Sequence, residues 1–226
     1  MCGRFSRDTT WEQVHAFSRG LDLIVPPEDP EPSYNIAPTQ SSWVLAAAEP
    51  AGAIARQMRW GLLPSWARDM KIGASMINAR LETVATKPAF RSAWKSRRCL
   101  VPASGYYEWR VEDGVKQPYW IHDSAGPVLM FAGLWENWKT PEGDWLQSFA
   151  IITRAAEGPM LQLHDRTPLM LDGVVLGDWL HGSTDAATAI ALSAPLPALA
   201  WHPVSRAVGN PRSNGPQLIE PIGRPG

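Results

Sequence analysis

Short apolar runs, separated by polar and turn residues, recur through the middle of the chain, a pattern typical of strands. Asp113 and Gly114 separate two of these runs, as the turn of a β-hairpin would. Short strands in close sequence order indicate a mainly antiparallel sheet. The runs that predict strands are 41–48, 53–64, 98–110, 118–123, 128–136 and 148–156.

Helical spacing is less frequent along the chain. Residues 9–17 have the apolar spacing of a short helix, with Thr9 or Thr10 as its N-cap. Residues 85–94 form a second candidate helix, entered through Thr86 and Pro88. Five prolines between 26 and 38 predict an irregular loop. No linker-like break divides the 226 residues, so we expect one α+β domain.

The overall composition is that of a globular protein, with 45% apolar and 19% charged residues and a net charge of −1. The two cysteines, Cys2 and Cys99, form no disulfide framework and fit a reducing compartment. No run of about 18 apolar residues could span a membrane, and the first residues lack the apolar core of a signal peptide. We therefore expect a cytoplasmic protein.

Positive charge is concentrated in one part of the sequence. Between Arg56 and Arg98 there are ten Lys and Arg residues against two acids, Asp69 and Glu82. This excess is consistent with a basic groove for an anionic ligand, but composition alone favours a solvated face balanced by acids elsewhere. Most of the twelve tryptophans should lie in the core, and a few exposed ones could stack on nucleobases.

Cys2 is the first candidate for chemistry. A small residue at this position normally permits removal of Met1, which leaves an α-amine and a thiol on adjacent carbons. The ordinary pKa values of these groups are about 8 and about 8.5, so both react near neutral pH. Such an aminothiol attacks an acyl carbon or closes on an aldehyde to form a thiazolidine. Gly3 permits close approach of a ligand and Arg4 places a cation beside the thiol, but Cys2 could also have no role.

Other candidate catalytic or ligand-binding residues are polar side chains within otherwise apolar stretches of sequence. Glu108, among tyrosines and a tryptophan, is expected to have a raised pKa and to transfer protons, unless it lies on the solvent side of a strand. His164 interrupts an apolar run and is either a general acid/base or a structural histidine. Asn78 and Arg80 would share one face of a strand and suit an oxygen-rich ligand, or they cap a loop.

Metal and cofactor chemistry have little sequence support. The five histidines are scattered, and no CxxC or HxxxH pair occurs. The chain also has no glycine-rich phosphate loop and no GxSxG elbow. We therefore expect no metal site and no cofactor.

Taken in order, several motifs match one pattern: MCGRF, YNIAPTQ, RWGLLPSW, INARLET, SGYYEW, LHDRTPLML and WHPVSRAVGN. From Cys2 to about Asn214 the chain closely resembles the SRAP family, the SOS-response-associated peptidases or abasic-site processing proteins. The resemblance implies one barrel-like domain over residues 1–226, with a core at about 2–214 and a tail at 215–226. It also implies a monomer that works at the bacterial nucleoid.

The resemblance further implies that the protein binds abasic sites in single-stranded DNA. Cys2 would form a thiazolidine crosslink with the ring-opened sugar, and Asn78 would orient the sugar and the cysteine. Glu108 would assist Schiff-base formation and reversal, and His164 would promote strand incision by β-elimination. The implied DNA-binding residues are Arg4, Pro38, Trp66, Arg80, Thr153, Arg166, Ser205 and Arg206.

Two departures from the family pattern stand out. Ala67 follows Trp66 where some relatives have a second tryptophan, which would weaken base stacking on one side. Thr39 stands where the family more often has glycine, which would reshape that loop.

Two other functions stay open: an N-terminal-nucleophile cysteine peptidase or amidohydrolase that removes its own Met1, and a non-catalytic single-strand binder. The basic segment favours a DNA ligand over the peptidase or amidohydrolase function. A non-catalytic single-strand binder would not need Cys2.

Overall fold

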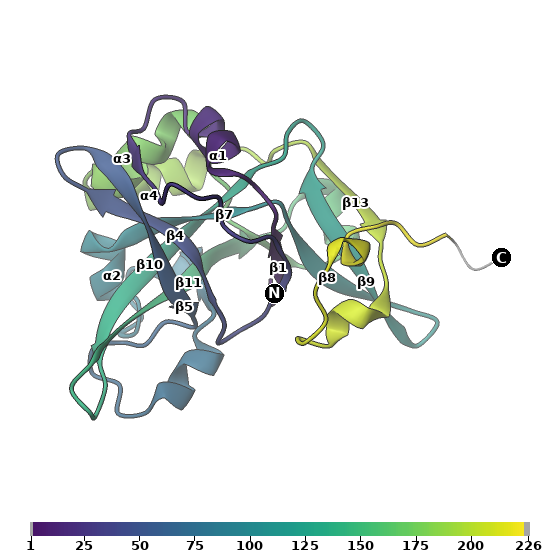
Figure 1. The fold of residues 1–226 in the computed structure, drawn as a ribbon, viewed down its shortest axis with the longest axis horizontal. Helices are drawn as coiled ribbons and strands as arrows, with labels where there is room; N and C mark the ends of the chain where they lie inside the picture. The colour runs from purple at the N-terminus through teal and green to yellow at the C-terminus, as the bar shows by residue number, and fades with distance from the viewer. Residues whose placement is uncertain (1, 224–226) are drawn as a thin grey trace.

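The computed structural model describes residues 2–223, and within this range the chain is mostly β-structure with short helices (Figure 1). The strands are β1 Phe5–Arg7, β2 Leu23–Ile24, β3 Ser33–Ile36, β4 Ser41–Ala48, β5 Gly52–Trp60, β6 Asn78–Arg80, β7 Arg98–Ala103, β8 Gly105–Glu112, β9 Val115–Asp123, β10 Leu129–Lys139, β11 Trp145–Ala155, β12 Arg166–Pro168 and β13 Leu199–Pro203. The α-helices are α1 Trp11–Phe17, α2 Arg91–Ser96, α3 Leu176–His181 and α4 Thr184–Ser193. Short 3-10 helices are η1 Met70–Ser75, η2 Leu81–Thr83, η3 Gly158–Gln162, η4 Gly173–Val175, η5 Arg206–Gly209 and η6 Pro216–Leu218.

Two sheets make up the molecule. One has the order β13-β9-β8-β1-β3, and the other has the order β12-β11-β10-β7-β4-β5-β2. In the second sheet β5 pairs antiparallel with β4 and also parallel with β11, so that β11, β10, β7, β4 and β5 close into a barrel. The expected α+β fold with a mainly antiparallel, barrel-like sheet is therefore confirmed.

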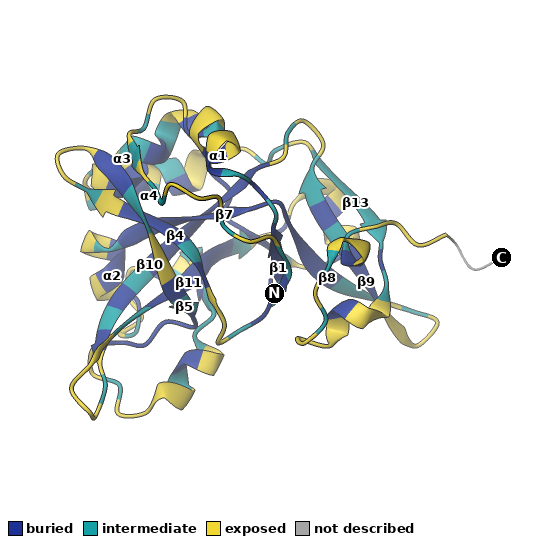
Figure 2. Ribbon diagram, in the orientation of Figure 1, coloured by how far each residue is buried: buried dark blue, intermediate teal, exposed yellow. Residues whose placement is uncertain are grey.

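Barrel strands β7 and β10 are buried on both faces along most of their length, which explains why their sequences are nearly continuous in apolar residues. On β4, Leu45 packs in the cluster that faces the helices with Trp94 and Trp179. Its neighbour Val44 packs in a second cluster, which includes Phe5 and other residues of the five-stranded sheet. Buried residues accordingly run along the strands, while the helices expose their outer faces (Figure 2).

The predicted helix near the N-terminus is confirmed as α1. Its capping box is complete, because Thr10 accepts from the backbone N–H of Gln13 and the Gln13 side chain accepts from that of Thr10. The second predicted helix begins later than expected, at Arg91 rather than near residue 85. Pro88 has no N–H and disfavours the helical conformation at Lys87, so turns precede the helix.

The prediction that the proline-rich segment 26–38 is an irregular loop is wrong in part, because the segment contains β3. The four residues of β3 include no proline, and they pair antiparallel with β1 through Phe5–Ile36 and Arg7–Ser33.

Near the C-terminus, Leu218 is 1% exposed and packs with Tyr107. Within residues 2–223, no helix is both long and apolar enough to cross a membrane.

Candidate functional site

The start of the chain is held beside the centre of the five-stranded sheet. Strands β1 and β8 are antiparallel with Phe5 opposite Tyr106, and the Tyr107 N–H donates to the Arg4 carbonyl at 3.0 Å. Continuing this register places Gly3 opposite Glu108, and the charge of Glu108 acts on the thiol of the adjacent Cys2. The Cys2 side chain is 0% exposed, which places its thiol inside the protein in this state.

Asn78 ties the first residues to the barrel. It opens β6, which runs parallel to β11, and its Nδ2 donates to the Cys2 carbonyl at 2.8 Å. The Asn78 Oδ1 is buried and has no hydrogen-bond partner in the described part of the chain. A buried amide oxygen without a donor is costly, so it is poised to accept from a hydroxyl or amine brought to Cys2.

Glu108 supplies a carboxyl group next to the thiol. It is 3% exposed, and burial, helped by the charge of Asp165, raises its pKa to about 7. Burial, together with the charge of Glu108, raises the pKa of the Cys2 thiol well above its ordinary value. The thiol therefore needs a base to become a thiolate, and Glu108, whose charge acts on the thiol, is the candidate.

His164 precedes β12 and contacts Asp165, whose charge acts on Glu108. Its Nδ1 is 2.7 Å from Asp165 Oδ1 and also accepts the Arg166 N–H at 3.0 Å. The first contact requires a proton on Nδ1, whereas the second requires none. Because burial lowers the pKa of His164, we favour the neutral ring, and the short contact with Asp165 favours its proton on Nδ1, which leaves Nε2 as the basic nitrogen.

Sequence reasoning missed three residues of this cluster, namely Tyr106, Asp165 and Thr167. Tyr106 is 0% exposed, and its hydroxyl lies 3.1 Å from Thr167 Oγ1. Burial raises the pKa of Tyr106, and the charges of Cys2 and Glu108 add to that effect. The alternation of β8 was the available signal, since it places Tyr106 and Glu108 on the same face.

The expected DNA-binding residues divide into two groups. Trp66 is 56% exposed, Arg80 and Arg206 are exposed, and Pro38 is half-buried. These side chains are accessible to a ligand. Ser205 is also half-buried, but its Oγ accepts the Ala207 N–H and caps η5.

The remaining residues of that set are engaged inside the protein. Arg4 Nη1 donates to Asn35 Oδ1 and to the Val208 carbonyl, each at 2.6 Å. Arg166 donates to both carboxylate oxygens of Glu82, at 2.5 and 3.0 Å, and to the carbonyl of Thr153, whose side chain is fully buried. These contacts hold elements together whatever else the residues do.

The basic segment 56–98 is only partly available for a ligand. Arg98 is 4% exposed and donates to the carbonyls of Trp94, Trp179 and Gly182, which fixes α3 against β7. Its neighbour Arg97 forms an ion pair with Glu136 at 2.7 Å. Part of the charge excess therefore serves the fold, and the exposed remainder is available to a groove. Exposed cations of this segment are Arg56, Arg68, Lys71, Arg80, Lys87, Arg91 and Lys95.

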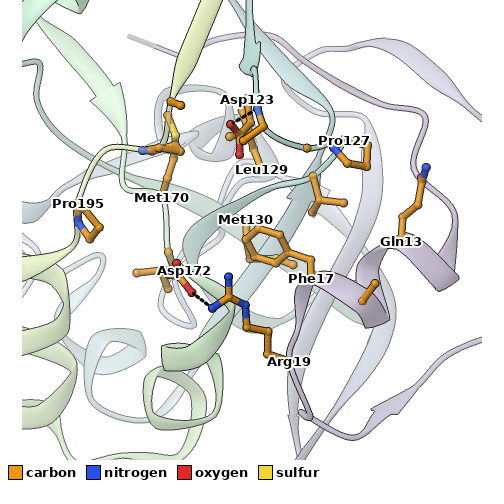
Figure 3. A pocket seen from close by; sticks show the side chains of 17 residues that line it. Gln13, Phe17, Arg19, Asp123, Pro127, Leu129, Met130, Met170, Asp172 and Pro195 are labelled. Atoms are coloured by element: carbon orange, nitrogen blue, oxygen red, sulfur yellow. Dashed lines mark hydrogen bonds and ion pairs between the residues drawn. The ribbon is translucent and has the colours of Figure 1, made fainter.

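A cavity of about 460 Å³ lies apart from the predicted residues (Figure 3). Its wall is largely apolar, with Phe17, Leu129 and Met170 among its lining residues, and the ion pair between Arg19 and Asp172 at its edge spans 3.6 Å. Cys2, Asn78, Glu108 and His164 are not among its lining residues.

Over residues 2–223, no group of three or more His, Cys, Asp or Glu side chains is placed to hold a metal ion.

Comparison with known proteins gives a consistent picture. Residues 1–211 match the family described as SOS response associated peptidase (SRAP). The abasic site processing protein YoqW of Bacillus subtilis is 38% identical over 97% of this chain and 99% of its own length. The abasic site processing protein YedK of Escherichia coli is 35% identical over 98% of this chain and all of its own. A crystal structure from Bacteroides thetaiotaomicron has the same fold, with a TM-score of 0.80 at 23% identity over 98% of this chain and 100% of that one.

Proposed function

Because this chain belongs to the SRAP family, the SOS response associated peptidases, we propose that it is an enzyme that processes abasic sites in single-stranded DNA. The relatives that match nearly its whole length are named for abasic site processing. The observation that carries the proposal is the buried Cys2, hydrogen-bonded by Asn78 and influenced by the charge of the buried Glu108. We place this activity in the DNA damage response, at the nucleoid of a bacterial cytoplasm, with the protein acting as a monomer.

The proposed reaction joins Cys2 to the aldehyde of the ring-opened sugar. The α-amine adds to the aldehyde carbon, and loss of one water gives a Schiff base. The thiol sulfur then bonds to the same carbon while its proton passes to the nitrogen, which closes a thiazolidine. The amine exists only after removal of Met1, a residue outside the described range 2–223.

Glu108 is suited to both proton transfers. With a pKa raised by burial to about 7, it exists in both protonation states near neutral pH. The acid form protonates the departing hydroxyl of the carbinolamine, and the carboxylate then takes the proton of the Cys2 thiol and passes it to the nitrogen. A base is required because burial keeps that thiol protonated.

His164 serves strand incision in this proposal. A neutral imidazole accepts the proton that leaves the sugar carbon next to the Schiff base, and the flanking phosphate departs by β-elimination. The lowered pKa of His164 favours the neutral form that this step needs.

The DNA strand would run over the accessible residues of the set. Trp66 offers a face for base stacking, and Arg80 and Arg206 offer charge to phosphates, with Pro38 and Ser205 beside them. Arg4, Arg166 and Thr153 would shape this surface chiefly by holding its elements in place.

Mixing the protein with a single-stranded oligonucleotide that carries one abasic site tests the proposal. A denaturing gel should show a protein–DNA adduct with that strand, less adduct with a duplex, and none with an undamaged strand. Cys2→Ala should retain noncovalent binding without the adduct. Failure of the wild-type protein to form an adduct would refute the proposed function.

The peptidase alternative makes a separate prediction. Peptidase activity would release an amine from an unrelated peptide, which an amine-reactive assay detects. The names of the matching relatives refer to abasic sites, so we propose no peptide cleavage in trans.

A further inference from the structure

A second cavity, of about 310 Å³, lies at the seam between the two sheets. Strand β1 contributes Arg7 to its wall, β4 contributes Ser42, and β5 contributes Gln57. Cys2, Asn78, Glu108 and His164 do not line it. The cavity is therefore a separate feature from the site described above.

Arg7 is the unusual residue of this cavity. It is 5% exposed, and its Nη2 donates to the Glu31 carbonyl at 2.6 Å. Its Nε and Nη1 are buried and have no hydrogen-bond partner in the part of the chain that the structure describes. Burial lowers the pKa of Arg7, yet a guanidinium stays charged in proteins. A buried cation with two unsatisfied donors calls for an anionic acceptor.

Ser42 adds a second unsatisfied group to the same wall. It is also 5% exposed, and its Oγ is buried without a partner over residues 2–223. Ser33, Ser41 and Gln57 line the cavity as well. A guanidinium with serine and glutamine residues in the same wall is a donor set that suits the oxygens of a phosphate group.

From this arrangement we propose that the cavity binds a phosphate group, with Arg7 and Ser42 as its principal donors. The group belongs either to free phosphate or to the backbone of a bound DNA strand. Cys2 and Arg7 are five residues apart on one extended segment, a separation of at most about 17 Å. A strand engaged at Cys2 is thus within reach of the cavity.

Glu31 gives the proposal a sharp control. Its exposed side chain belongs to the same wall and brings a negative charge that opposes an anion. Removing that charge by Glu31→Gln should strengthen phosphate binding, whereas Ser42→Ala should weaken it. Opposite effects from two small changes are not expected from a general loss of folding.

The test is a calorimetric titration of the full chain with inorganic phosphate at low ionic strength. Direct heats are needed because phosphate also stabilises proteins by exclusion from their surface. Wild type should bind saturably, Arg7→Gln should lose about tenfold or more in affinity, and Ser42→Ala should lose about threefold. Glu31→Gln should gain about two- to fivefold. Arg19→Gln, a matched change at the edge of the other cavity, should bind as wild type does.

A second titration, in the presence of a saturating undamaged single strand, identifies the source of the phosphate. Loss of phosphate binding assigns the cavity to a backbone phosphate, and retained binding assigns it to free phosphate; either outcome supports the site. Cys2→Ala should bind phosphate normally, so this result is independent of crosslinking. The proposal is overturned if wild type shows no saturable binding at millimolar phosphate, or if Arg7→Gln, Ser42→Ala and Glu31→Gln all bind as wild type does.

Discussion

Asn78 Nδ2 donates a hydrogen bond to the carbonyl oxygen of Cys2 at 2.8 Å, across 76 positions of sequence. Through this bond the barrel, by way of β6 and β11, fixes the residue proposed to react. A side-chain hydrogen bond of this kind contributes about 1 kcal/mol, so Asn78→Ala should slow crosslinking by about fivefold. A gel time course with saturating DNA measures the rate.

Asn137→Ala is the matched control for that change. Its Oδ1 accepts from Gln147 Nε2 at 3.1 Å on the β10–β11 hairpin, and neither residue contacts Cys2 in the hydrogen bonds described. This variant should crosslink at the wild-type rate. Equal rates for Asn78→Ala and wild type would remove Asn78 from the site.

Glu108 should impose a pH dependence on stability. Burial raises its pKa from an ordinary value of 4.5 to about 7, so the folded protein retains this proton where the unfolded chain has lost it. The contribution of Glu108 to the free energy of unfolding is fully present below about pH 4.5 and is lost as the pH rises to about 7. The loss is on the order of 3 kcal/mol at most.

Glu108→Gln removes this titration. Urea unfolding at about pH 5 and about pH 8 should show a smaller stability difference in the variant than in wild type. The same variant should crosslink more slowly, because glutamine transfers no proton. An unchanged stability difference would show that Glu108 ionises as an ordinary carboxyl group.

Arg80 and Arg166 should respond differently to the same substitution. Arg80 is exposed, so Arg80→Gln should lower the slope of log affinity against log salt by about one. Arg166 is held by Glu82, and this contact lowers the pKa of that carboxyl. Arg166→Gln should therefore leave the slope near that of wild type and reduce stability. Fluorescence anisotropy with an undamaged single strand measures both slopes, and equal slope changes would contradict the assignment.

Thr39 adopts φ 74°, a left-handed conformation that a β-branched residue rarely takes. Its backbone N–H donates to the Trp60 carbonyl at 2.8 Å and its carbonyl accepts from Arg59 Nη1 at 2.6 Å, bonds that glycine would keep. Thr39→Gly should therefore raise the free energy of unfolding by about 0.5–1 kcal/mol, after allowance for the flexibility of glycine. Denaturation in urea checks this, and a loss of stability would mean that the loop depends on the Thr39 side chain.

Local patterns in the sequence predicted many of the strands and one helix. Short apolar runs marked the barrel strands, and the Asp113-Gly114 turn joins β8 to β9 as expected, with φ of 49° and 78°. Helix α4 was missed because its buried side chains, such as Ala187 and Ala191, are too small to create a strong apolar stripe. Barrel closure by parallel pairing of β5 with β11 joins distant segments and leaves no local signal.

The candidate site was only partly accessible to sequence reasoning. Resemblance to a family indicated Cys2, Asn78 and Glu108, and the fold brings these residues together. Sequence alone could not show that Arg4 is occupied by Asn35, because that contact depends on the pairing of β1 with β3. The unpaired donors of Arg7 were likewise invisible, since burial is a property of the folded chain.

The central claim is that the N-terminal aminothiol of Cys2 forms the bond to DNA. Protein crosslinked to an abasic single strand is digested, and tandem mass spectrometry locates the modified residue. The account predicts that Met1 is absent, that the adduct lies on Cys2, and that its mass equals the two partners less one water. An adduct on another residue, or a crosslinked chain that retains Met1, would contradict it.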